Sequence, residues 1–235
     1  MTASLQDKHV VITGGTGALG GAVLAKLLGE GAICHVPNAH AGAPAHFAYA
    51  TNERVRLVNN VDLADAGKVD AFYSNIPDLW ASIHLAGGFT SAPIEKTDPA
   101  AFEEMMDTNV RTTFLCCRAA VRSMLASGIG GRIVNVSARP GLNPRRGAGM
   151  VAYTTAKAAV AAMTVALAEE GKGAGILVNA IAPSTFDTPA NREAMPDADF
   201  DAWISLEAAA ETVAALVSTR NLATSGALLP LYGKV

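Results

Sequence analysis

Apolar, β-branched runs alternate with longer helical stretches along the 235 residues. Parallel strands need a crossover between them, so this order predicts βαβ units around a parallel sheet that helices cover on both faces. The expected strands are 9–13, 32–36, 54–58, 81–85, 132–136, 177–181 and 227–230. The expected helices are 20–29, 99–127, 151–170 and 206–219. The sequence therefore indicates one doubly wound α/β domain that spans residues 1–235 and contains seven strands.

Three segments between these elements lack helical periodicity and carry several prolines and glycines. They are 37–52, 138–149 and 183–200. In an open α/β sheet, the loops that follow the carboxyl ends of strands form the ligand crevice. We expect 37–52 to be an irregular crossover, 138–149 to be a mobile loop, and the last two segments to border the ligand.

Composition excludes several classes of partner. Only 17% of residues are charged and the net charge is −3, so the chain has no general attraction to nucleic acid. The first eight residues lack the apolar run of a secretion signal, and the most apolar stretch, 158–168, is shorter than the roughly 20 residues of a membrane span. The spacing of the cysteines and histidines predicts no metal site. We expect a cytoplasmic protein that acts on a small molecule, without a membrane or nucleic-acid partner.

A glycine-rich segment follows the first expected strand and opens the first expected helix. From Thr13 to Gly20 it reads TGGTGALG. Glycine permits a tight turn and a close approach of the backbone to a pyrophosphate, whose charge then meets the positive end of the helix. Glycine clusters also occur in turns for steric reasons, but the strand–turn–helix context predicts dinucleotide binding. The residues expected to contact the dinucleotide here are Gly14, Thr16, Gly17, Ala18 and Leu19.

Side chains at the end of the second expected strand usually determine whether such a fold binds NAD or NADP. A carboxylate there binds the ribose hydroxyls of NAD, and a nearby arginine accommodates the 2′-phosphate of NADP. This chain has Asn38, which could bond ribose hydroxyls without repelling a phosphate, so the cofactor is expected to be NAD or NADP. After the third strand, Asp62 and Leu63 are expected beside the adenine, with a helix-capping role for Asp62 as an equal alternative.

Tyr153 and Lys157 lie at the start of an alanine-rich expected helix. A spacing of four puts both side chains on one helix face. The ordinary pKa values are about 10 and about 10.4, so an adjacent ammonium and a positively charged nicotinamide would favour the phenolate. Such a phenol can protonate a carbonyl oxygen and can accept the proton in the reverse reaction.

These segments together resemble the short-chain dehydrogenase/reductase family over essentially the whole chain. The resemblance implies a Rossmann-type fold and hydride transfer between a nicotinamide and a carbonyl or alcohol. It implies that Tyr153 is the general acid/base, that Lys157 also bonds the nicotinamide ribose, and that Asn109 holds a water in the proton relay. By the same resemblance, the further cofactor contacts are Ala86, Gly87, Gly88, Pro183, Thr185 and Thr188, beside Tyr153 and Lys157 themselves.

The serine that orients the substrate in this family does not align in the usual way. The run from Asn135 to Gly141 reads NVSARPG, so Ala138 takes the usual serine position. Ser137 precedes it by one residue and would face the other side of a strand. A local shift of the following loop could return Ser137 to the site, and Ser137 is therefore kept as a candidate catalytic residue.

Two other functions stay open. Dihydropteridine reductases lack this serine, and segments 14–20, 187–200 and 225–228 resemble theirs, so reduction of a quinonoid pteridine is one alternative. The other is a dinucleotide-binding sensor without turnover, against which Asn109, Tyr153 and Lys157 argue. The resemblance also implies a homodimer or homotetramer whose long helices pack together through apolar residues, which we expect to be Phe114, Leu115, Val160 and Met163.

Overall fold

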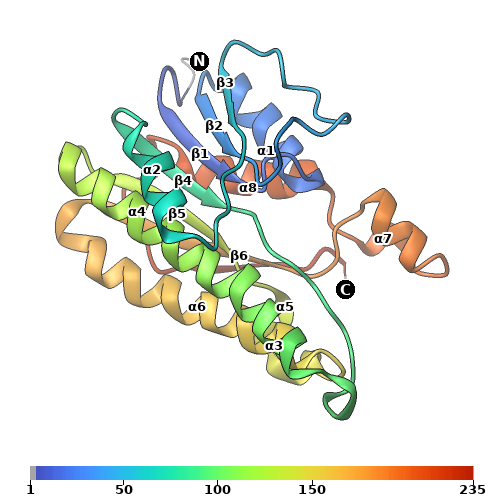
Figure 1. Ribbon diagram of the computed structural model, residues 1–235. Coiled ribbons are helices and arrows are strands. Elements are labelled where there is room, and N and C mark those ends of the chain that lie inside the picture. Colours follow the sequence, from blue (N-terminus) through green and yellow to red (C-terminus); the bar gives the residue numbers. More distant parts are fainter. Residues whose placement is uncertain (1–3, 235) are drawn as a thin grey trace.

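The computed structural model describes residues 4–234 and contains one parallel sheet in the order β3-β2-β1-β4-β5-β6-β7 (Figure 1). The strand order reverses at β1 and β4, which pair directly. This is the arrangement of a doubly wound fold, whose ligand crevice lies at the carboxyl ends of the strands at the point of reversal. The strands are His9–Thr13, Ile33–Pro37, Val55–Val58, Leu79–His84, Gly131–Val136, Ile176–Pro183 and Leu228–Leu231. All seven predicted strands are confirmed.

Helices cover both faces of the sheet (Figure 1). On one face α1 (Ala18–Gly29) packs against α8 (Leu206–Val217). On the other face lie α2 (Ala66–Ser74), α4 (Thr112–Ser127) and α6 (Val151–Gly171). Three shorter helices are α3 (Pro99–Met105), α5 (Arg139–Leu142) and α7 (Pro189–Ala194). The predicted Rossmann-type arrangement is therefore confirmed.

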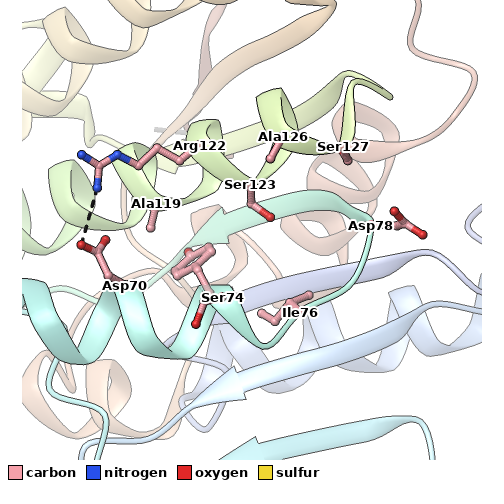
Figure 2. Close-up of a pocket in the computed structure, with 10 residues that line it drawn as sticks. Asp70, Ser74, Ile76, Asp78, Ala119, Arg122, Ser123, Ala126 and Ser127 are labelled. Atoms are coloured by element: carbon pink, nitrogen blue, oxygen red, sulfur yellow. Dashed lines mark ion pairs between the residues drawn. The ribbon is translucent and has the colours of Figure 1, made fainter.

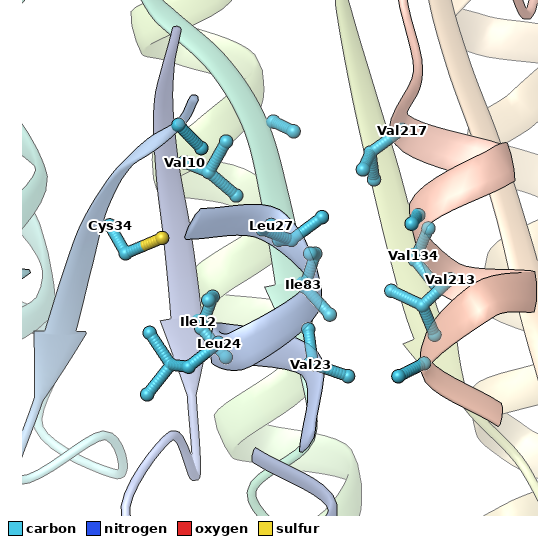
Figure 3. Packing of buried hydrophobic residues seen from close by; sticks show 14 of the residues in the cluster. Val10, Ile12, Val23, Leu24, Leu27, Cys34, Ile83, Val134, Val213 and Val217 are labelled. Carbon is cyan, nitrogen blue, oxygen red and sulfur yellow. The ribbon is translucent and has the colours of Figure 1, made fainter. Parts of the chain in front are cut away.

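Two apolar layers hold the sheet between these helices. Figure 3 shows the first, where Leu24 and Leu27 of α1 and Val213 of α8 pack over Ile12 and Ile83 of the central strands. These side chains are fully buried. The second layer joins residues of α2, α4 and α6 to the opposite sheet face. Leu115 and Val160 are buried within this chain, so the expectation that they face another subunit is wrong.

A chain of polar side chains crosses the second layer. Tyr73 Oη lies 2.8 Å from Ser82 Oγ, and Ser82 Oγ lies 2.8 Å from His84 Nε2. On its other side, His84 Nδ1 lies 2.8 Å from Asn135 Oδ1. Asn135 Nδ2 donates to Thr164 Oγ1 at 2.9 Å. Burial lowers the pKa of His84 to about 4, so the ring is neutral within this chain of hydrogen bonds.

The structure corrects three details of the predicted elements. The predicted helix 99–127 is α3 and α4 joined by a π-helical turn, Met106–Arg111. Helix α2 was not predicted; it begins at the N-cap Asp65, whose carboxylate accepts from two backbone N–H groups. The segments 138–149 and 183–200 contain α5 and α7 rather than only irregular loop. Segment 37–52 is irregular after Pro37, as expected.

Within residues 4–234, one helical run, Val151–Ala174, is long and apolar enough to cross a membrane by length and composition alone. Of that run's apolar window, 39% is buried inside the fold. Helix α6 packs against β6 and α5, as a core helix of a layered α/β domain does.

Candidate functional site

The glycine-rich turn lies between β1 and α1 and is fixed by close backbone contacts. Gly14 has a φ of +65°, and a Cβ on it would lie 2.8 Å from the backbone nitrogen of Ala86. A Cβ on Gly20 would lie 2.2 Å from the carbonyl oxygen of Gly14. No side chain caps α1 at its N-cap, Gly17. The backbone N–H groups at this helix start are therefore suited to an anion such as a pyrophosphate.

A cavity of about 310 Å³ opens beside this turn, at the carboxyl ends of β1, β2 and β4. Seven residues predicted from the sequence line it: Gly14, Thr16, Asn38, Asp62, Leu63, Ala86 and Gly87. Gly17, Ala18 and Leu19 lie at the start of α1, outside the lining set. The lining residues Asp107, Thr108 and Thr112 were not predicted as cofactor contacts, because they come from the π-helical turn and the start of α4, far from the glycine-rich turn in sequence. The place and the glycine cradle fit the adenosine half of a dinucleotide.

Asn38 lines the cavity, but its side chain is committed to the loop that follows β2. Its amide nitrogen donates to Gly42 O and Asn59 Oδ1, both at 2.8 Å, and to His40 O at 3.3 Å. The hydrogens of this amide therefore shape the loop, while its oxygen accepts from the N–H of His40 at 3.4 Å. A bond from a ribose hydroxyl to that oxygen stays a prediction. Asp62 is exposed and accepts from the N–H of Ala64 at 2.9 Å, a capping contact that leaves its second carboxylate oxygen free.

Asn109 sits in the π-helical turn between α3 and α4 and is buried. Its amide nitrogen donates to Gly88 O and Met105 O, both at 3.1 Å, while its Oδ1 is buried without a hydrogen-bond partner. A Cβ on Gly87 would lie 2.6 Å from that oxygen and 3.5 Å from Lys157 Nζ. A buried acceptor without a partner usually meets a water or a ligand. This position fits the predicted water-holding role of Asn109.

Tyr153 and Lys157 project from the first turns of α6. The Lys157 ammonium lies 5.7 Å from the centre of the Tyr153 ring and donates to the carbonyl oxygen of Val136 at 3.0 Å. Burial lowers the pKa of Lys157 to about 8 and raises the pKa of Tyr153 to about 12. Burial therefore decides the direction of the phenol pKa here. A lowering by the ammonium together with a positively charged nicotinamide stays a prediction.

Ser137 is fully buried beneath α6, and its hydroxyl donates to the carbonyl oxygen of Lys157 at 2.8 Å. A hydroxyl that is buried and bonded to the α6 backbone does not reach a substrate. The catalytic role considered for Ser137 is therefore corrected to the positioning of α6. Ala138 holds the neighbouring position, which supplies no hydroxyl either.

Phe89 packs beside Tyr153, and the predicted contacts Pro183, Thr185 and Thr188 lie at or just after the end of β6. Phe89 is 64% exposed and meets the Tyr153 ring edge to face, with the ring centres 4.9 Å apart. Pro183 ends β6. Thr185 O accepts from the N–H of Ile204, and the Thr188 hydroxyl caps α7 by accepting from the N–H of Asn191 at 3.2 Å. Thr185 and Thr188 therefore follow the carboxyl end of β6, where the sequence placed them.

A second hollow, of about 560 Å³, lies between α2 and α4 (Figure 2). Figure 2 shows Arg122 paired with Asp70, whose charged atoms lie 3.6 Å apart. The residues of α4 that line this hollow lie near the carboxyl end of the helix, just before β5 begins. The hollow is therefore at the amino ends of the strands. It shares no residue with the cavity beside the glycine turn, and we do not include it in the site.

Comparison with known proteins agrees with this geometry. A family model described as short chain dehydrogenase matches residues 8–199. An uncharacterized oxidoreductase of Mycobacterium tuberculosis is 36% identical over 188 residues, which are 78% of this chain and 69% of that protein. Galactitol 2-dehydrogenase of Rhizobium johnstonii is 32% identical over 204 residues, 82% of this chain and 79% of that enzyme. The solved structure of ElxO with NADP bound superposes with a TM-score of 0.88 at 23% identity, covering 97% of this chain and 98% of that one, which is a likeness of fold.

Proposed function

Because the chain belongs to the short-chain dehydrogenase/reductase family and is an NAD(P)-dependent oxidoreductase, we propose that it interconverts a carbonyl compound and an alcohol, with Tyr153 as the general acid/base. The observation that carries this proposal is the place of Gly87, which lines the glycine-cradled cavity and lies beside both the unpartnered Asn109 Oδ1 and the Lys157 ammonium. That ammonium lies in turn 5.7 Å from the centre of the Tyr153 ring.

The residues that would hold the dinucleotide fall in two groups. The turn after β1 offers backbone N–H groups to the pyrophosphate, and Asp62 and Leu63 flank the adenine. Lys157, Pro183, Thr185 and Thr188 would hold the nicotinamide half, which supplies or accepts the hydride when bound. The cradle fits this group, because side chains on Gly14 or Gly20 would collide with backbone atoms.

The chain's own residues supply the proton. In carbonyl reduction, Tyr153 donates its phenolic proton to the oxygen of the substrate, and in alcohol oxidation the phenolate accepts it. Burial holds the phenol protonated, with a pKa near 12, which suits the reducing direction. Lys157 is held against Val136 O, and its ammonium favours the phenolate once Tyr153 has given up its proton.

Reduction of a quinonoid pteridine is a second candidate, and one observation favours it. The hydroxyl of Ser137 donates its hydrogen bond to the α6 backbone, and Ala138 has no hydroxyl. This segment therefore offers no serine to orient a ketone. The exposed ring of Phe89 beside Tyr153 offers a flat conjugated substrate a stacking surface instead.

The test compares Tyr153→Phe with Tyr49→Phe, a control in the loop between β2 and β3. A carbonyl panel and a quinonoid pteridine are assayed with NADPH and with NADH. Loss of the phenolic proton should lower kcat by about 10²- to 10⁴-fold, while the cofactor Kd stays unchanged and Tyr49→Phe has little effect. Turnover that survives in Tyr153→Phe would contradict the role of Tyr153. The absence of turnover in the parent protein, with dinucleotide binding intact, would favour the sensor.

We also propose that residues 1–235 form one domain that acts in the cytoplasm as a homodimer or homotetramer, without a nucleic-acid or membrane partner. The three cysteines are buried and free, which suits a reducing compartment. Phe114 is 53% exposed on α4, beside Met106, Val110, Ala159 and Met163, and this apolar face supports self-association.

A further inference from the structure

The connection between β2 and β3 has an unusual charge pattern for a wall of a dinucleotide site. Residues 37–52 contain no Asp, Glu, Lys or Arg, and their only ionisable side chains besides Tyr49 are His40 and His46. The carboxylates that line the cavity, Asp62 and Asp107, come from other segments. The place where a carboxylate would bind the ribose hydroxyls of NAD is therefore without one.

Hydrogen bonds hold the loop after β2, where the carboxylate is missing, in a defined shape. The N–H of Asn38 donates to Val58 O at 2.8 Å, and the N–H of Asn60 donates to His40 O at 3.0 Å. The Asn38 side chain closes the turn through Gly42 O and Asn59 Oδ1. Asn38 has no amide hydrogen left for a ligand. Ala39 and His40, by contrast, are exposed and line the cavity.

We call the side of the cavity formed by Thr16 and residues 38–40 the wall. Besides Asn38, the polar side chains of this wall can donate hydrogen bonds. The His40 ring and the Thr16 hydroxyl belong to residues that line the cavity. His46 reaches the glycine-rich turn from further along the same loop, with its Nε2 3.1 Å from Thr16 O. Imidazole and hydroxyl donors stabilise a phosphate, and a ribose diol finds no carboxylate acceptor here.

From this wall we infer that the enzyme prefers NADP(H) to NAD(H), with His40 as the principal donor to the 2′-phosphate and His46 and Thr16 beside it. The inference rests on the family's use of NAD or NADP and adds which of the two this chain selects. It does not depend on the identity of the carbonyl substrate.

The test measures binding, without turnover, by fluorescence titration of NADPH and NADH in about 0.15 M salt. In the parent protein we expect a Kd for NADPH at least tenfold below that for NADH. Ala39→Asp should raise the NADPH Kd by at least tenfold and change the NADH Kd little or lower it, because a carboxylate repels the 2′-phosphate and accepts from ribose hydroxyls. Ala41→Asp is the matched control. It adds the same charge to the same loop at an exposed residue outside the cavity lining, and should change each Kd less than threefold.

His40→Ala and His46→Ala test the donors. We expect a larger loss of NADPH affinity for His40→Ala, about fivefold or more, with the NADH Kd unchanged in both variants. Equal or tighter binding of NADH by the parent overturns the preference, and equal effects of Ala39→Asp and Ala41→Asp overturn the assignment of this wall. Failure to bind either nucleotide would instead contradict the proposed function itself.

Discussion

Lys157 is held at the end of β5 through two different atoms. Its ammonium donates to Val136 O, and its backbone carbonyl accepts from the hydroxyl of Ser137. Gly141 packs against the same carbonyl, since a Cβ there would lie 2.9 Å from it. Ser137 thus acts on the reaction through the position of α6, and not through the substrate.

This role predicts a loss of stability rather than of chemistry. Ser137→Ala should lower the free energy of unfolding by about 0.5–1.5 kcal/mol, because a buried hydrogen bond to the α6 backbone is lost while Lys157 O keeps its helical partner. The kcat should fall less than about threefold. Urea unfolding and steady-state kinetics measure the two effects, with Ser123→Ala, a change outside the site, as the control. A fall in kcat of a hundredfold with unchanged stability would return Ser137 to the catalytic residues.

At the scale of the elements, the first turn of α1 requires glycine at position 20 but has room for a larger side chain at position 21. A Cβ on Gly20 would lie 2.2 Å from Gly14 O, whereas a Cβ on Gly21 meets nothing within 4 Å. Gly20→Ala should therefore displace the turn, destabilise the fold and raise the cofactor Kd by at least tenfold. Gly21→Ala should instead raise the free energy of unfolding by about 0.5–1 kcal/mol.

Thermal unfolding and nucleotide titration of the two variants check this pair. If Gly20→Ala binds the dinucleotide as the parent does, the turn after β1 is not the pyrophosphate site.

The elements that could be predicted from the sequence are those whose pattern is local. The strands were found because a run such as Val10, Val11 and Ile12 is buried on both faces and reads as continuously apolar. Helix α2 was not predicted because only three of its nine residues, Val69, Phe72 and Tyr73, form the buried apolar face, which is too short a pattern. The π-helical turn around Asn109 and the short helix α5 depend on packing against α6, which no local pattern reports.

The site follows the same division. The glycine turn, Tyr153 and Lys157 could be found from their spacing together with their place in the order of strands and helices. The side-chain directions of Asn38 and Ser137 could not, because each is decided by acceptors distant in sequence: Asn59 Oδ1 for Asn38 and Lys157 O for Ser137.

At the scale of the whole molecule, the exposed apolar face of α4 and α6 predicts self-association. Met106, Val110, Phe114, Ala159 and Met163 surround a hollow of about 520 Å³, together with the ion pair of Asp107 and Arg111. We expect light scattering after gel filtration to give a multiple of the 24.1 kDa chain mass. Phe114→Asp should shift the protein towards the monomer, because a charge would be buried at the interface.

Leu125→Asp is the control, since Leu125 is 56% exposed on the same helix but outside that face. A particle of 24.1 kDa in the parent protein, or equal effects of the two substitutions, would contradict the predicted interface.

The polar chain through His84 should make the fold less stable in acid. The ring stays neutral in the core, with a pKa near 4, whereas the unfolded chain takes up a proton below about pH 6.5. The stability tied to this ring is complete above about pH 6.5 and is lost as the pH falls towards 4, by up to roughly 3 kcal/mol. The urea midpoint should therefore drop between pH 7.5 and pH 5, and drop less in His84→Asn. An equal drop in both proteins would place the acid sensitivity elsewhere. Acid would thus weaken a catalyst built on this core through an imidazole that never meets the substrate, and the buried ring of His35, whose pKa is also lowered to about 4, would act in the same direction.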